Sequence, residues 1–130
     1  MKKIIILLAH GSPEKYARGI IISLKGKLSQ YFPKNKFELY HAFLEFNKPR
    51  LEECFKQVFK NKRTRTAPVS VVILPVFISK GSHIMFQVPK IIKSIKKKYK
   101  NIDVKLALPL GADDLVVKIL YTRYKQIVRK

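Results

Sequence analysis

The sequence predicts an α/β fold, a doubly wound sheet of four parallel strands in the order 2-1-3-4. Four strand-like runs alternate with four helix-like runs, and this alternation is typical of a parallel sheet with helices on both faces. The strand runs span residues 4–9, 37–44, 69–77 and 103–108, and the helix runs span 13–32, 49–62, 82–99 and 113–128.

The strand patterns themselves predict the strand order. Residues 4–9 and 69–77 are continuous apolar runs, which is typical of strands that are buried on both faces and lie at the centre of a sheet. Residues 37–44 and 103–108 alternate between apolar and polar positions, as edge strands do. Right-handed crossovers then favour the order 2-1-3-4, in which the sheet reverses its direction of growth between strands one and three.

Each helix-like run carries apolar residues at helical spacing, which predicts an inward face. In the first helix, Ser12 can serve as the N-cap and Pro13 suits the first helical position. The predicted inward residues of the four helices are, in order, Tyr16, Ala17, Ile20, Ile21, Leu24, Leu28 and Tyr31; Leu51, Cys54, Phe55, Val58 and Phe59; Met85, Val88, Ile91, Ile92, Ile95 and Tyr99; and Val116, Ile119, Leu120, Tyr124 and Ile127.

Length and composition restrict the class of protein. A chain of 130 residues suits a single domain over 1–130, and its one cysteine, Cys54, excludes an internal disulfide and a cysteine-rich zinc site. Because Cys54 lies on an apolar helix face, a buried thiol is expected rather than a nucleophile. No apolar stretch approaches the roughly 20 residues of a membrane span, so we expect a cytoplasmic protein without a membrane partner.

The chain is strongly basic, with a formal net charge of +20. Such a field attracts polyanions, either nucleic acid or a small molecule with many carboxylates. The lysines are spread over several helices rather than clustered with exposed aromatic residues, which makes nucleic acid an unlikely partner. A solvated lysine-rich surface is the plain alternative.

Chemistry-bearing residues follow three of the predicted strands. His10 follows the first strand, His83 the third and Glu45 the second. Ligands of such sheets bind at the carboxyl ends of the strands, where the strand order reverses. Two imidazoles and a carboxylate can bind Fe, Co, Ni or Zn, so the pattern predicts a metal site.

Each of these residues also has a structural interpretation. His10 could hydrogen-bond a neighbouring loop, His83 could cap or line the third helix, and Glu45 could pair with a lysine. His41 lies among core residues of an edge strand and is expected to be structural. Dinucleotide, Walker and hydrolase motifs are missing, and Ala9 stands where a histidine phosphatase needs an arginine.

Several motifs together resemble a known family, the small sirohydrochlorin cobalt and iron chelatases of the class II chelatases. The similarity runs from about residue 3 to residue 123. The motifs that carry it are Ile6–Pro13, Ala42–Phe46, Leu74–Phe77, Gly81–His83, Val88–Pro89 and Leu108–Gly111.

The resemblance implies a chelatase-like (flavodoxin-like) half-domain that pairs as a homodimer and acts as a lyase. It implies that His10 and His83 bind the incoming metal and that Glu45 is a third ligand or a proton acceptor. Gln87 departs from the family pattern, which usually has an acidic residue there, and glutamine cannot act as a base.

The implied reaction exchanges two pyrrole N–H protons of sirohydrochlorin for one divalent ion, Co²⁺ or Fe²⁺ or possibly Ni²⁺, without an organic cofactor. The product would enter siroheme- or cobalamin-type tetrapyrrole synthesis. The residues expected to bind the carboxylates of this substrate are Ser12, Lys48, Arg50, Lys80 and Ser82. A non-catalytic metal carrier and a basic nucleic-acid-binding domain remain alternative functions.

Overall fold

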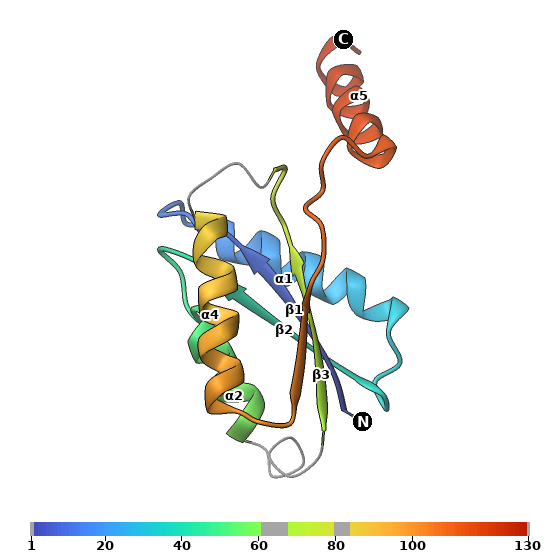
Figure 1. Cartoon of the computed structure of the whole chain (residues 1–130). Coiled ribbons are helices and arrows are strands. Elements are labelled where there is room, and N and C mark those ends of the chain that lie inside the picture. The colour runs from blue at the N-terminus through green and yellow to red at the C-terminus, as the bar shows by residue number, and fades with distance from the viewer. Residues whose placement is uncertain (1, 61–67, 80–83, 130) are drawn as a thin grey trace.

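The protein contains one parallel four-stranded sheet with the strand order β2-β1-β3-β4 (Figure 1). The computed structural model describes residues 2–60, 68–79 and 84–129. The strands are β1 (Lys2–Ala9), β2 (Phe37–Phe43), β3 (Val69–Pro75) and β4 (Ile102–Leu106). The predicted order is therefore confirmed, with the two continuous apolar runs at the centre and the two alternating runs at the edges.

Helices lie on both faces of this sheet. They are α1 (Ala17–Leu28), followed by a 3-10 turn η1 (Ser29–Tyr31), α2 (Leu51–Lys60), α4 (Ile84–Lys98) and α5 (Asp114–Val128). Figure 1 shows α2 and α4 together on one face and α1 on the other.

The main core lies between the sheet and the pair α2 and α4. Alternate residues of β1, β3 and β4 point to this side and meet the apolar faces of the two helices, as the spacing of those residues predicts. The buried members of this cluster are Ile4, Ile6, Leu8, Ala42, Leu44, Leu51, Cys54, Phe55, Val58, Phe59, Val69, Val71, Ile73, Val88, Ile95 and Val104. Burial raises the pKa of the Cys54 thiol to about 12, so the expected inert thiol is confirmed.

The α1 face of the sheet is much less covered. Its buried cluster contains only Ala9, Ile21 and Phe43 among the described residues. The inward face predicted for the first helix is therefore largely wrong, because Ile20 is 59% exposed and Tyr16 76% exposed. Ile21 alone is buried in α1.

Helix α1 also begins later than predicted. Its first residue is Ala17 rather than Pro13, and its N-cap Tyr16 makes no side-chain capping bond. Ser12 does not cap it, because its Oγ accepts a hydrogen bond from Glu14 N at 3.1 Å while its own N–H donates to Asn47 Oδ1 at 2.8 Å. Ser12 therefore bonds to Glu14 in the turn before α1 and to Asn47 in the loop after β2, and it does not cap the helix.

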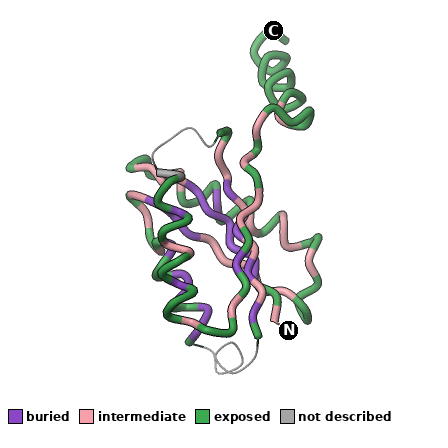
Figure 2. The backbone as a smooth tube through the Cα atoms, in the orientation of Figure 1, coloured by how far each residue is buried: buried purple, intermediate pink, exposed green. Residues whose placement is uncertain are grey.

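Helix α5 stands away from the sheet, with its whole length exposed (Figures 1 and 2). Leu120 is 65% exposed and Ile127 is 79% exposed, so the inward packing predicted for this helix within the chain is wrong. Asp113 is the N-cap of α5, because its Oδ1 accepts from Leu115 N at 2.9 Å. None of the described helices combines the length and the apolar character that a membrane span requires.

Candidate metal centre

His10 lies directly after β1, where the strand leaves the sheet beside β2. The register pairs Ala9 with Phe43, so the residues that follow both strands emerge at one edge. Two backbone bonds continue this pairing, from Leu44 N to Ala9 O at 3.0 Å and from Glu45 N to His10 O at 2.8 Å. The predicted meeting of His10 and Glu45 is confirmed by this extension of the sheet.

The two side chains contact each other at this edge. His10 Nε2 and Glu45 Oε2 are 3.2 Å apart, and the side chains are 43% and 40% exposed. Two donors bound to one ion at about 2.0–2.2 Å each, at roughly a right angle, are separated by about 3 Å. The two side chains are thus within hydrogen-bond distance of each other, their two atoms also have the spacing of neighbouring ligands of a divalent metal, and the pair is open to solvent.

Gly11 is required by this arrangement. Its φ is +94°, a conformation that residues with a side chain rarely adopt, and a Cβ there would fall on the Glu45 carbonyl oxygen. The loop after β1 can therefore lie directly against the loop after β2 only because residue 11 is glycine. The close approach of the two backbones therefore explains why a glycine follows His10.

Two residues of the loop after β2 position the pair, and sequence reasoning did not assign them this role. The Phe46 ring stacks on the His10 ring, with centroids 6.3 Å apart and planes at 22°. Asn47 accepts the Ser12 N–H, and its own N–H donates to Glu45 O at 2.7 Å. Phe46 has φ 66°, in the left-handed region, and nothing in the sequence predicts this conformation for a phenylalanine.

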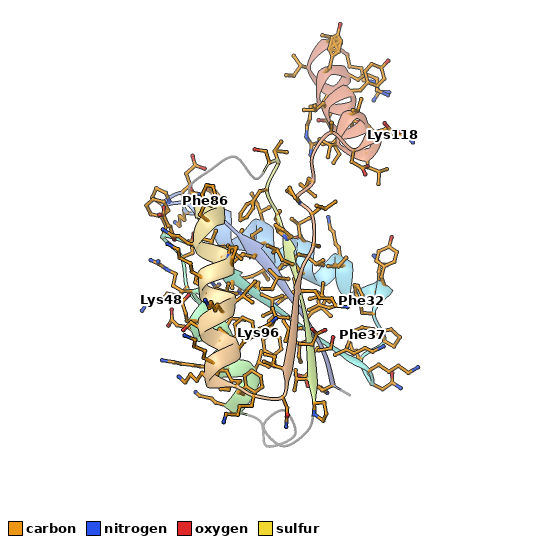
Figure 3. The ribbon with its side chains drawn as sticks, in the orientation of Figure 1. Phe32, Phe37, Lys48, Phe86, Lys96 and Lys118 are labelled. Atoms are coloured by element: carbon orange, nitrogen blue, oxygen red, sulfur yellow. The ribbon has the colours of Figure 1, made fainter. Side chains whose placement is uncertain are left out.

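Arg50 joins the two ends of the same loop by a hydrogen bond. Its Nη1 donates to Leu44 O at 3.2 Å, and its backbone N–H donates to Glu53 Oε1 at 3.1 Å. Lys48 is exposed and is labelled in Figure 3. The substrate-binding roles of Lys48, Arg50 and Ser12 remain predictions, and Arg50 has a structural role in addition.

The third predicted ligand lies outside the described residues. His83, Lys80 and Ser82 all fall in the segment 80–83, about which the structure says nothing. Within the described ranges, no three His, Cys, Asp or Glu side chains come together in a group that could hold a metal ion. The described part of the predicted metal site is therefore the pair His10 and Glu45.

His41 does not belong to this site. Its Nδ1 lies 2.8 Å from Lys25 Nζ, so a neutral imidazole accepts a hydrogen bond from the ammonium. Burial, then the charges of Lys25 and Arg18, lower the pKa of His41 below its usual value. The lone pair on Nδ1 is thereby occupied, which agrees with the expected structural role.

Sequence comparison identifies the family of the chain. Residues 4–127 match the model of the CbiX family. The sirohydrochlorin cobaltochelatase of Sulfurisphaera tokodaii is 26% identical over 125 residues, which cover 96% of this chain and 93% of the relative. The enzyme of the same name from Saccharolobus solfataricus is 26% identical over 132 residues, covering 97% and 96% of the two chains.

Solved structures show the same fold. A putative cobalamin biosynthesis CbiX protein from Marinobacter aquaeolei superposes with a TM-score of 0.72 at 19% identity, covering 99% of this chain and 97% of that one. SirB from Bacillus subtilis with Fe³⁺ superposes with a TM-score of 0.78 at 25% identity, covering 98% of this chain but 48% of that one. The fold, the family match over nearly the whole length and the His10–Glu45 edge agree, and the chain belongs to the CbiX family.

Proposed function

We propose that this protein is a sirohydrochlorin chelatase that inserts Co²⁺ or Fe²⁺ into the macrocycle. The observation that carries the proposal is the 3.2 Å spacing of His10 Nε2 and Glu45 Oε2 at the carboxyl edge of the sheet. The curated relatives described above bear the name sirohydrochlorin cobaltochelatase, and the Bacillus subtilis neighbour was solved with Fe³⁺. Both metals are thus candidates for the substrate ion.

The reaction needs a weak metal site and acceptors for two protons. An imidazole is a common ligand of divalent metals and can also accept a proton, so His10 can bind the incoming ion and take up a pyrrole proton as the ion leaves. Glu45 is placed to share the ion or to take the second proton, which restores the charge balance when one divalent ion replaces two protons. His83 is proposed from the sequence as the further imidazole ligand.

The surroundings of the pair suit a flat polyanionic substrate. Phe46 is 58% exposed beside His10, and Phe86 is 74% exposed near the start of α4, the end that faces the carboxyl edge in Figure 3. Exposed rings offer apolar faces to a macrocycle. Lys48 and Arg50 on the neighbouring loop supply positive charge for its carboxylates, and Ser12, Lys80 and Ser82 are proposed as further contacts.

We also propose that the protein acts as a homodimer in the cytoplasm, as a single domain per chain and without an organic cofactor. The Bacillus subtilis chain, of which this chain covers 48%, is about twice as long, so two copies of this chain correspond to one such molecule. The buried, unpaired Cys54 suits a reducing compartment.

The test is anaerobic metal insertion into sirohydrochlorin, followed by the change in visible absorbance with Co²⁺ and with Fe²⁺. We expect His10→Gln and Glu45→Gln each to reduce the rate about 100-fold or more, because each removes a metal ligand or proton acceptor. The matched controls are His41→Gln and Glu52→Gln, which change the same residue types away from the site and should stay within about twofold.

Two outcomes would contradict the proposal. Wild-type insertion no faster than the uncatalysed reaction would exclude a chelatase, and metal binding without insertion would then indicate a metal carrier. Equal rates for His10→Gln and His41→Gln would place the metal centre elsewhere.

A further inference from the structure

Helix α5 carries a broad apolar face that no described part of its own chain covers. At 100° per residue, seven of its apolar side chains fall within an arc of roughly 140°, wider than the stripe a surface helix needs to join a core. These residues are Val116, Val117, Leu120, Tyr121, Tyr124, Ile127 and Val128. The opposite arc is mixed, with Lys118 (labelled in Figure 3), Thr122 and Lys125 beside the exposed Leu115 and Ile119. The pattern is that of a docking helix without its receiving surface.

A receiving surface lies open on the α1 side of the sheet. The β3 residues on this side, Val72, Leu74 and Val76, are only half-buried. Beside them is an apolar groove of about 170 Å³, lined by Phe32, Phe37, Ile5, Val72 and Leu74 among others. Figure 3 labels Phe32 and Phe37, whose rings contact each other edge to face.

Helix α1 extends this open surface rather than covering it. Lys25 reaches from α1 to His41 on β2, so that flank of the helix faces the β2 edge. Ile20, Leu24 and Tyr31 lie on the opposite flank of the same helical stretch and are 59%, 40% and 75% exposed. Their flank therefore faces β3, and they continue the half-buried strip of β3 into one apolar surface.

Helix α5 is held away from this surface in its own chain. The segment before it runs alongside the extension of β3, where Leu110 N donates to Phe77 O and Gly111 N donates to Ile78 O, both at 2.8 Å. These bonds carry the chain past the carboxyl edge of the sheet before α5 begins.

We infer that α5 docks on the α1-side surface of a second copy of this chain, and that the second copy returns its own α5 in exchange. The exchange is closed by a two-fold axis, so each unpaired helix and each open surface finds its counterpart. Two helices and two receiving surfaces would together bury on the order of 2,000 Å², which is within the range of stable dimers. The match of this chain to 48% of a longer relative fits a second copy as the occupant.

The exchange also concerns the metal centre. The segment leading to α5 leaves the sheet at its carboxyl edge, which is the edge that carries His10 and Glu45. The inference specifies the contact of the proposed homodimer, but it does not depend on metal insertion.

The first test is the dimer dissociation constant, measured by sedimentation equilibrium. We expect the wild type to be a dimer and Leu120→Asp to raise its dissociation constant by at least about 100-fold, because the carboxylate would be buried in the contact. Thr122→Asp is the matched control, since it adds the same charge on the side of the same helix opposite the seven-residue face, and it should change the constant by less than about fivefold. Circular dichroism checks that both variants keep their helices.

The second test distinguishes exchange from self-docking. A chain carrying both Leu120→Cys and Val72→Cys is treated with a short bis-maleimide and run on a denaturing gel. Exchange gives a covalent dimer, whereas an α5 folded on its own sheet gives an internally linked monomer. The internally linked monomer would overturn the inference.

The outcomes also separate this inference from the proposed dimer and from the proposed activity. A wild-type monomer would overturn both the dimer and the exchange. A dimer that Leu120→Asp leaves intact would overturn the exchange alone, and the insertion assay is read independently of either.

Discussion

The two faces of the sheet differ in how completely they are packed. Beneath α2 and α4, Phe55 and Val58 are fully buried, and the apolar faces of both helices point where their spacing predicts. On the other face α1 buries one residue, and α5, which stands away from the sheet, buries none. The apolar residues of α1 and α5 are less sharply gathered on one face than those of α2 and α4, so their spacing predicts a helix but not the chain on which its apolar face docks.

The largest expected difference concerns one leucine in each region. Leu51→Ala, at a position 1% exposed under the sheet, should lower the free energy of unfolding by about 2–5 kcal/mol through the cavity it leaves. Leu120→Ala on α5, at 65% exposure, should change it by less than about 0.5 kcal/mol when the chain is monomeric. Urea denaturation at concentrations below the dimer dissociation constant measures both values. Equal losses would mean that α5 packs within its own chain.

Two glycines with positive φ sharpen the comparison. Gly11→Ala combines backbone strain with a collision against the Glu45 carbonyl, so we expect a loss of about 3 kcal/mol and a displaced His10. Gly111→Ala has φ +61° and open space around the added carbon, so strain alone should cost about 1 kcal/mol. Thermal unfolding of the two variants gives the difference. A Gly11→Ala protein as stable as Gly111→Ala would show that the two site loops do not touch.

The smallest expected effect is a pH dependence on the α1 side. Burial and Lys25 lower the pKa of His41, so the unfolded chain takes up this proton at a higher pH than the folded one. The contribution of His41 to stability is therefore complete above its ordinary pKa of about 6.5 and is lost as the pH falls below it. The free energy of unfolding should change with pH by well under about 1.4 kcal/mol per pH unit, the value for uptake of one whole proton, because the residue is partly exposed.

Urea denaturation between pH 7.5 and 5 tests this prediction. His41→Gln keeps an acceptor for Lys25 but cannot titrate, so its stability should fall less than that of the wild type. Lys25→Gln removes one of the two main causes of the shift and should give an intermediate slope. Identical slopes in all three proteins would show that His41 does not couple to folding.

Much of the fold could be predicted because the pattern of apolar residues within a short segment indicates which of its side chains are buried. Continuous apolar runs placed β1 and β3 at the centre of the sheet, and alternation placed β2 and β4 at its edges. The same topology brought His10 and Glu45 to one edge, since parallel strands end together. The burial of Cys54 followed from its place among the apolar residues of α2.

Contacts between segments far apart in the chain decided the rest. Asn47 accepts the Ser12 N–H and Ser12 Oγ accepts from Glu14 N, so Ser12 belongs to the loop before α1, and the helix starts at Ala17. Phe46 stacks on His10 through a backbone turn that no local pattern marks.

The placement of α5 is the clearest case. Its apolar spacing and its Asp113 cap determine that it is a helix with a face to bury. The hydrogen bonds from Leu110 and Gly111 to the segment after β3 decide that the helix leaves its own sheet. Periodicity depends only on neighbours along the chain, whereas the direction in which a helix departs depends on non-local backbone bonds, which only the tertiary structure shows.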